Sequence, residues 1–422
     1  MKAFFASEAV ADSGQDNVLG RFLRYVKTDT QSDPASETYP STQGQLVLLK
    51  MLAGELAAMG LADVEMDEYG YVTATIPATT SKKVPVIGFI AHVDTSSDVS
   101  GTDVKPQVVK YTGGDIIANS ELGIILSEEE LKEYRGQTLV TTDGTTLLGA
   151  DDKAGVAEIM TAASYLISHP QVEHGTIRIA FTPDEEIGKG VDHFDVEKFG
   201  ARYAYTIDGG ALGSFEYETF NAAEAHIEIT GYNTHPGAAL GKMVNAQSIA
   251  FDIDRALPQQ ERPEFTSGRQ GFFHLTETNG DVELCKMHYI IRDHDNKLFE
   301  RKKQLLTNIT AQINKDWGAE RIKLDMHDQY YNMREKIEPH PEVISVALEA
   351  MKQAGVMPVI DAVRGGTDGS RLSYMGLPCP NIFSGAENMH SRKEFVNVEV
   401  MERAVEVIVN IGAIFCSNIL DN

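Results

Sequence analysis

The stretch VPVIGFIAHVDT, residues 84–95, contains a continuous apolar run that ends at a histidine and an aspartate. A run without alternating polar residues predicts a strand buried on both faces, as in a parallel sheet. In open α/β sheets, ligands bind beyond the carboxyl ends of the strands. His92 and Asp94 therefore lie where a binding site is expected, although a core histidine beside a turn aspartate would give the same local pattern.

The segments on either side alternate between predicted strands and helices. Residues 17–59 have helical periodicity with a turn near 28–41, and residues 64–76 predict two strands joined by a tight turn. Residues 154–169 predict an amphipathic helix, and 398–415 a closing helix. Further strands are predicted over 176–182, 202–207, 357–360 and 380–383. This alternation predicts an α/β fold with a mostly parallel sheet and helices on both faces.

The middle of the chain has a different order of elements. Strands are predicted over 225–231, 271–277, 283–293 and 321–327, and helices over 244–257 and 297–317. The resulting β-α-β-β-α-β order is ferredoxin-like. We expect a smaller α+β domain of residues 221–329, inserted into a larger domain that comprises residues 1–220 and 330–422.

Composition excludes several classes of partner. The chain has 422 residues, of which 42% are hydrophobic, and a formal net charge of −25. Nucleic acids and anionic membranes attract basic surfaces, so neither is expected as a partner. No apolar stretch reaches the ~18–20 residues of a transmembrane helix. Three widely spaced cysteines, Cys285, Cys379 and Cys416, fit a reducing compartment, and we expect a cytoplasmic protein.

Side chains typical of a metal centre follow several of the predicted strands. Two histidines with several carboxylates, and no cysteine among them, suit a hydrolytic zinc or manganese pair better than a structural zinc site. These residues are His92, Asp151 in LLGADDKAG, Glu185 and Glu186 in FTPDEEIGKG, Asp208 in AYTIDGG, and His390 in ENMHSRKEF.

Each of these segments also has a purely structural interpretation. Asp151 and Asp152 would cap a helix, and Glu185 and Glu186 would form the acidic first turn of another helix. The convergence of several strand ends on one chemistry favours the metal centre. Adjacent glutamates can divide two tasks, one binding metal and the other acting as general base. Asp94 can accept the second ring N–H of His92.

In their order along the chain, these motifs resemble those of the superfamily of co-catalytic zinc aminopeptidases, carboxypeptidases and deacylases. The phrases HYIIRD, YYNMREK, RGGTDG and GLPCPN resemble its tripeptide aminopeptidases. The resemblance extends from about residue 22 to the C-terminal helix, and residues before 17 are an extension. Lys393 departs from the pattern, because tripeptide aminopeptidases often have a second histidine there.

The resemblance implies a role for each residue of the motifs. His92, Asp151, Glu186, Asp208 and His390 would bind two Zn²⁺ ions per subunit, with Mn²⁺ or Co²⁺ as possible substitutes, and Asp151 would bridge them. Glu185 would be the general base, and Asp94 would orient His92. The peptide bond between Asp151 and Asp152 is expected to be cis. The larger domain would be the catalytic dimetal-binding domain, and the inserted one a lid and dimerisation domain.

The same resemblance assigns residues of the inserted domain. His235 in YNTHPG would stabilise the oxyanion, in relatives often from the partner subunit, so a homodimer is expected. Asn245, Arg292 and Arg364 would bind the substrate, because a guanidinium binds a peptide carboxylate bidentately. From the residues alone, His235 could be a turn histidine before Pro236, and Arg292 could pair with a neighbouring aspartate.

The function that the resemblance implies is metal-dependent hydrolysis of the N-terminal residue from short peptides, tripeptides above all. A related dipeptidase, carboxypeptidase or N-acyl amino acid deacylase would have the same metal site. A nicotinamide dehydrogenase has no support, since no GxGxxG follows the first strand.

Overall fold

The computed structural model describes residues 16–417, so the predicted N-terminal extension lies almost wholly outside the described residues. The chain divides into two compact units. The first unit comprises residues up to Tyr217, Glu335–Asp361 and residues from Thr367 onward. The second unit comprises Glu218–Arg334 and Ala362–Gly366. No helix within residues 16–417 has the length and apolar character needed to cross a membrane.

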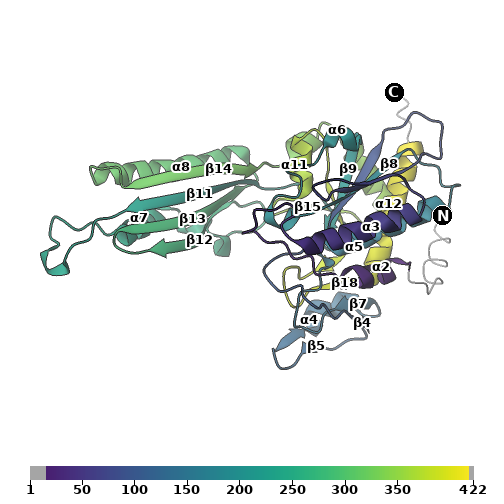
Figure 1. The fold of residues 1–422 in the computed structure, drawn as a ribbon, viewed down its shortest axis with the longest axis horizontal. Helices are drawn as coiled ribbons and strands as arrows, with labels where there is room; N and C mark the ends of the chain where they lie inside the picture. The colour runs from purple at the N-terminus through teal and green to yellow at the C-terminus, as the bar shows by residue number, and fades with distance from the viewer. Residues whose placement is uncertain (1–15, 418–422) are drawn as a thin grey trace. The chain divides into compact units, whose positions relative to one another are not determined.

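The first unit is built on an eight-stranded sheet (Figure 1). Its strands, in spatial order, are β1 (Ala62–Met66), β2 (Val72–Ile76), β8 (Ile177–Thr182), β3 (Ile87–His92), β9 (Tyr203–Gly209), β16 (Asn381–Phe383), β10 (Ser214–Glu218) and β15 (Val359–Ala362). The central strands β8, β3, β9 and β16 are parallel, whereas β1, β2 and β10 pair antiparallel with their neighbours. The predicted α/β class is confirmed, with the parallel part at the centre of the sheet.

Strand β3 forms where the apolar run predicts it. All six of its residues are buried, which fits a strand at the centre of a sheet covered on both sides. Gly88 is required there for a steric reason. A Cβ atom at this position would lie 2.6 Å from a ring carbon of Phe199.

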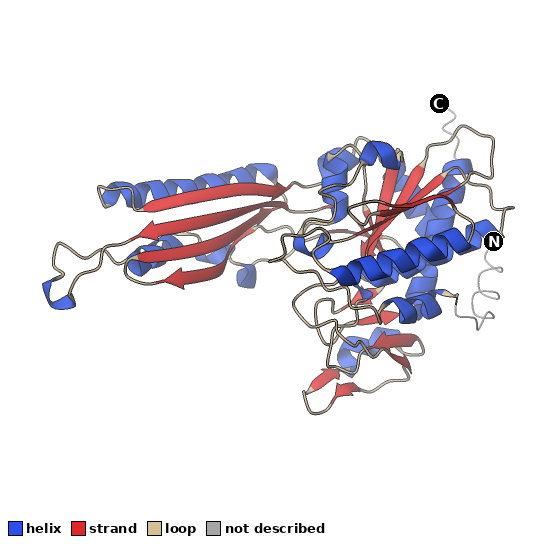
Figure 2. Ribbon diagram, viewed as in Figure 1, coloured by secondary structure: helices blue, strands red, loops and turns tan. Residues whose placement is uncertain are grey.

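Helices cover both faces of this sheet (Figure 2). The main core forms with α2 (Val18–Tyr25), α3 (Gln43–Ala58), α5 (Ala150–Ser168), α10 (Pro341–Gln353) and α12 (Val398–Ser417). A smaller core on the opposite face includes α6 (Val196–Phe199) and α11 (Asp368–Tyr374). Successive side chains of a strand point to opposite faces of the sheet. Phe89 of β3 therefore belongs to the first core and Ile90 to the second.

A second, four-stranded sheet in the first unit was not predicted from the sequence. It comprises β17 (Ala386–Glu387), β18 (Phe395–Asn397), β7 (Thr138–Thr141) and β4 (Gln107–Lys110). The hairpin of β5 (Ile116–Asn119) and β6 (Ile124–Leu126) and helix α4 (Glu128–Leu131) belong to the same region of the chain. Strands of two to four residues are too short to produce a periodic pattern, and the pairing of β7 with β18 joins segments that are distant in sequence.

The second unit has the predicted β-α-β-β-α-β order (Figure 1). Its elements are β11 (Asn221–Thr230), α7 (Ala246–Ala256), β12 (Phe272–Gly280), β13 (Leu284–Asp293), α8 (Asn296–Asp316) and β14 (Ile322–Tyr330). The sheet order is β12-β13-β11-β14, and all neighbours are antiparallel. Both helices pack on one face of this sheet and form a separate core with it. We refer to the other face as the outer face.

Candidate metal centre and active site

The carboxyl ends of three parallel strands bring the predicted ligands together. In the register of β3 and β8, His92 lies opposite Thr182. The chain after Thr182 turns directly into Glu185 and Glu186, and Asp208 lies near the end of β9. Since these strands run in the same direction, their ends meet at one edge of the sheet.

His92 lies between three carboxylates and is buried. Its Nε2 atom is 3.0 Å from Oδ1 of Asp151 and 3.5 Å from Oδ1 of Asp208. Its Nδ1 atom is 3.3 Å from Oδ1 of Asp94. Burial alone would lower the pKa of His92, but Asp208, Asp151 and Asp94 together raise it well above its ordinary value.

His390 forms a second set with the same aspartate. Its Nε2 atom is 3.2 Å from Oδ2 of Asp151 and 3.0 Å from Oε2 of Glu186. Its Nδ1 atom is 3.2 Å from Oδ2 of Asp98. The two oxygens of Asp151 thus face different histidines, Oδ1 toward His92 and Oδ2 toward His390. A carboxylate placed in this way can bridge two cations.

The donor set fits divalent metal ions. Donor atoms of His92, Asp151 and Glu186 all lie within 4.8 Å of one another, as do those of His92, Asp152 and Asp208. Oε1 of Glu186 is buried and has no hydrogen-bond partner among the described residues. Burial and the charge of Asp151 raise the pKa of Glu186 to about 7. Buried carboxylates at this density need a compensating positive charge.

Asp94 positions the two glutamates as well as His92. Its fully buried carboxylate accepts hydrogen bonds from the backbone N–H groups of Glu185, at 3.0 Å, and Glu186, at 3.1 Å. Burial raises the pKa of Glu185 well above its ordinary value. Within residues 16–417, the Glu185 carboxylate forms no hydrogen bond or ion pair, so it is available to a water molecule or a substrate.

Two further side chains, Glu394 and Asp184, hold the loops of the site, and the sequence analysis assigned no role to either. Glu394 is buried and accepts the backbone N–H groups of Leu148, Gly149 and Asp151 at 2.7, 2.8 and 3.1 Å. Its position in HSRKEF, four residues after His390, was the available signal. The peptide bond between Asp151 and Asp152 is cis, as the resemblance implies.

Asp184 fixes the turn that carries Glu185 and Glu186. Its backbone has a φ of 56°, in the left-handed region that few residues other than glycine adopt. Its buried carboxylate accepts hydrogen bonds from the backbone and hydroxyl of Ser41 and from the amide of Gln45. No sequence signal links these residues, because about 140 positions separate Gln45 from Asp184.

The remaining predicted residues belong to the second unit. His235 is exposed, and its Nδ1 accepts the backbone N–H of Gly237 at 3.1 Å. A ring nitrogen that accepts a hydrogen bond carries no proton, so the proton of the neutral ring is on Nε2. Asn245 is the N-cap of α7, where its Oδ1 accepts the backbone N–H of Gln247 at 3.0 Å.

The two arginines have neutral partners. Arg292 donates to the carbonyls of Ala223 and Ile291 and to Gln329. Arg364 is exposed and donates to the backbone at Gly268 and Gln270. Neither guanidinium is ion-paired within the part of the chain that the structure describes, so the alternative interpretation of Arg292, a pair with a neighbouring aspartate, is not supported. Both positive charges therefore remain available to an anionic ligand.

Comparisons with known proteins place the chain in a family. The model of peptidase family M20/M25/M40 matches residues 132–412. Peptidase T of Geobacillus thermodenitrificans is 56% identical over 405 residues, which cover 95% of this chain and 98% of that protein. Two crystal structures share the fold, both with a TM-score of 0.76. They are aminopeptidase PepT of Bacillus cereus, 24% identical over 95% of this chain and 99% of that one, and a tripeptidase of Staphylococcus aureus, 20% identical over 96% and 99%.

The matched region contains Asp151, the glutamate pair, Asp208 and His390, and the match to peptidase T extends over nearly the whole chain. This chain therefore belongs to peptidase family M20/M25/M40 and, within it, to the peptidase T group.

Proposed function

We propose that this protein is an aminopeptidase that removes the N-terminal residue of tripeptides at a centre of two divalent ions. The observation that carries the proposal is the position of Asp151, whose two carboxylate oxygens face two different histidines. We assign His92 and Asp208 to one ion, His390 and Glu186 to the other, and Asp151 to both. Imidazole and carboxylate donors suit zinc, with manganese or cobalt as alternatives.

When bound, such ions polarise a scissile carbonyl and lower the pKa of a coordinated water. Glu185 accepts a proton from the attacking water as that water adds to the carbonyl carbon. It then delivers this proton to the amine that leaves. Burial raises the pKa of Glu185 well above its ordinary value, which makes its carboxylate a stronger base.

We assign a second role to His235. Because its Nδ1 accepts a hydrogen bond, its Nε2–H is free to donate to the oxyanion that develops on the carbonyl oxygen. Arg292 and Arg364, whose charges are not paired, would bind the carboxylate at the C-terminus of the peptide, with Asn245 beside them. We further propose that the first unit is the catalytic domain and the second a lid and dimerisation domain, with His235 acting on a partner subunit. Three buried, unpaired cysteines support a cytoplasmic location.

A substrate panel tests the proposed activity. The enzyme, loaded with zinc or stripped by a chelator, is given a free tripeptide, its N-acetylated form and the matching dipeptide. We expect release of the N-terminal residue from the free tripeptide alone, lost on stripping and restored by metal. Cleavage of the acetylated peptide would indicate a deacylase or carboxypeptidase, and cleavage of the dipeptide a dipeptidase. Either result would contradict the proposed specificity.

A further inference from the structure

The outer face of the second unit carries a cluster of metal-type ligands separate from the first unit's site. His226 on β11 lies directly opposite His288 on β13, and their rings stack with centroids 4.4 Å apart. Glu224, two residues before His226, lies on the same face of β11. Its Oε2 atom is 3.4 Å from Nε2 of His288 and 3.8 Å from Nε2 of His226. The three donor atoms all lie within 4.8 Å of one another.

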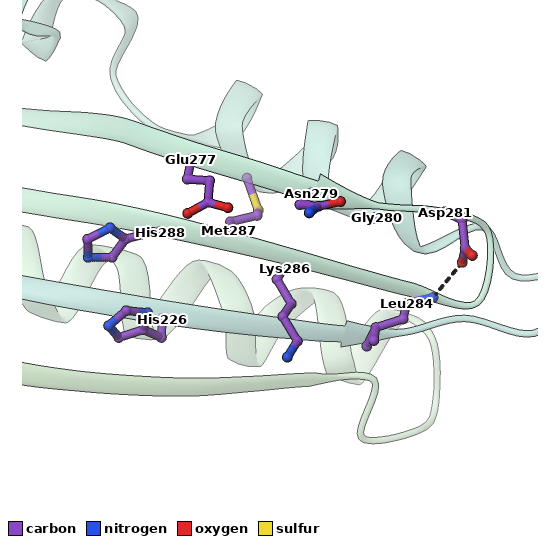
Figure 3. Close-up of a pocket in the computed structure, with 9 residues that line it drawn as sticks. All are labelled: His226, Glu277, Asn279, Gly280, Asp281, Leu284, Lys286, Met287 and His288. Carbon is purple, nitrogen blue, oxygen red and sulfur yellow. Dashed lines mark hydrogen bonds between the residues drawn. The ribbon is translucent and has the colours of Figure 1, made fainter. Parts of the chain in front are cut away.

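The cluster borders a pocket of about 610 Å³ (Figure 3). The two imidazoles lie side by side in this view, and Glu277 of β12 lies on the far side of His288. Lys286 also lines the pocket, but its ammonium group is 3.6 Å from a carboxylate oxygen of Glu228. Lys286, the basic residue of β13 nearest to the cluster, is therefore paired with a carboxylate outside the cluster.

One tautomer of His288 makes hydrogen bonds of both of its contacts with Thr276. The hydroxyl of Thr276 donates to the backbone carbonyl of His288 at 3.1 Å and lies 2.8 Å from Nδ1 of the same residue. A hydroxyl has one proton, so once it donates to the carbonyl it accepts from Nδ1–H. Nε2 of His288 then carries a lone pair, and this buried atom has no hydrogen-bond partner among the described residues.

The carboxylate of the cluster is held in a similar way. The side-chain amide of Gln329 donates to Oε2 of Glu224 at 3.3 Å, and Arg292 in turn donates to the oxygen of that amide. Metal-binding histidines and carboxylates are commonly oriented by such outer hydrogen bonds. The cluster thus has three converging donors, and outer groups orient two of them.

We propose that Glu224, His226 and His288 bind a divalent transition-metal ion and clamp β11 to β13. Two imidazoles and one carboxylate suit Zn²⁺, Ni²⁺, Co²⁺ or Cu²⁺, whereas Mg²⁺ and Ca²⁺ prefer oxygen ligands alone. Water would complete the coordination shell. None of these three ligands is assigned to the proposed peptidase centre, and all three come from the second unit.

Counting bound zinc tests the site directly. The full-length, zinc-loaded enzyme and its His226→Asn/His288→Asn variant are dialysed against the same zinc buffer, and zinc per chain is measured. We expect the wild type to hold one zinc more than the variant, with equal peptidase activity. The matched control is His274→Asn. His274 is an exposed histidine on β12 that lies opposite Ile290 rather than opposite a ligand, and its substitution should leave the zinc count unchanged. Equal zinc counts in the wild type and the double variant would overturn the proposal.

A second variant preserves all three ligands. Thr276→Val removes the hydroxyl that orients His288, and we expect the zinc affinity of this site to fall by about 10–100-fold. Hydrogen exchange provides a readout that does not depend on counting. Added zinc should slow exchange of the β11 and β13 amides in the wild type and not in the double variant. Unchanged affinity in Thr276→Val, together with zinc-independent exchange in the wild type, would contradict the clamp even if extra zinc were bound.

Discussion

The carboxylate of Asp94 accepts the backbone N–H of Glu185 at 3.0 Å, in a site where the same carboxylate also lies 3.3 Å from Nδ1 of His92. One buried side chain thus sets the orientation of a proposed metal ligand and the position of the proposed general base. Any displacement of Asp94 would therefore alter both.

Asp94→Asn should weaken metal binding about 10–100-fold. The backbone N–H groups of Glu185 and Glu186 bond to different oxygens of the Asp94 carboxylate, and an amide has only one oxygen that can accept. The matched comparison is Asp98→Asn. Asp98 lies 3.2 Å from Nδ1 of the other histidine, His390, but it is largely exposed and its interaction is screened by solvent. We expect a much smaller effect there. Metal affinity measured with a competing chelator separates the two variants, and equal losses would contradict the role of burial.

Glu394→Gln should destabilise the first unit. The Glu394 carboxylate accepts three backbone N–H groups in the loop that leads to Asp151. The amide nitrogen of glutamine cannot accept, so at least one buried N–H loses its partner, at a cost of about 1–3 kcal/mol. Glu387→Gln is the control, since Glu387 is half-buried and accepts a bond from the Tyr134 hydroxyl. Denaturant unfolding of both variants provides the measurement, and equal stabilities would refute this role.

Stability of the chelator-stripped enzyme should fall as pH rises. Burial raises the pKa of Asp208 to about 6 and, with the charge of Asp151, that of Glu186 to about 7. Both values exceed those of unfolded chains, about 3.9 and 4.3, so the folded state binds more protons between about pH 4 and 7. The free energy of unfolding therefore decreases across this window, by about 1.4 kcal/mol for each unit by which a pKa is raised.

Zinc should reverse this trend, because bound carboxylates are deprotonated and the ion balances their charge. The stabilisation by zinc should therefore grow from pH 5 to pH 7. Thermal unfolding with zinc and with chelator, recorded across this range, measures the difference. A gap between the two curves that is constant with pH would show that Glu186 and Asp208 do not bind the ion.

His235→Ala should lower kcat while leaving metal content and KM nearly unchanged. Removal of one oxyanion donor typically costs about 10²–10³-fold in kcat. His327→Ala, an exposed histidine in the same unit, is the control and should have wild-type activity. Steady-state kinetics with a tripeptide would reveal the difference. A His235 variant with wild-type kcat would remove this residue from the mechanism.

The elements of the fold that the sequence predicts are those with a strong local pattern. The apolar run of β3 and the helical periodicity of α5 were sufficient to locate them. The small sheet containing β4 and β7 was missed because its strands have two to four residues each, and β4 and β7 alternate only weakly between apolar and polar. Such strands are stabilised by pairing partners that are distant in sequence, which no local window contains.

The candidate site shows the same limit. The motif residues at strand ends could be collected because each adjoins a recognisable strand. Partners from elsewhere in the chain, such as Ser41 and Gln45 around Asp184, carry no signal of their own. Their contribution depends on proximity in the folded chain. In the sequence alone, a serine and a glutamine at these positions fit a helix cap or an exposed polar segment equally well.

The catalytic role of Glu185 is tested most directly by kcat of Glu185→Gln on a free tripeptide, measured together with the metal content of the variant. Glutamine preserves the shape of the side chain but cannot take a proton, so kcat should fall about 10²–10⁴-fold with the metal content of the wild type. Glu186→Gln should instead lose metal. Wild-type kcat in Glu185→Gln with metal bound would show that Glu185 is not the general base.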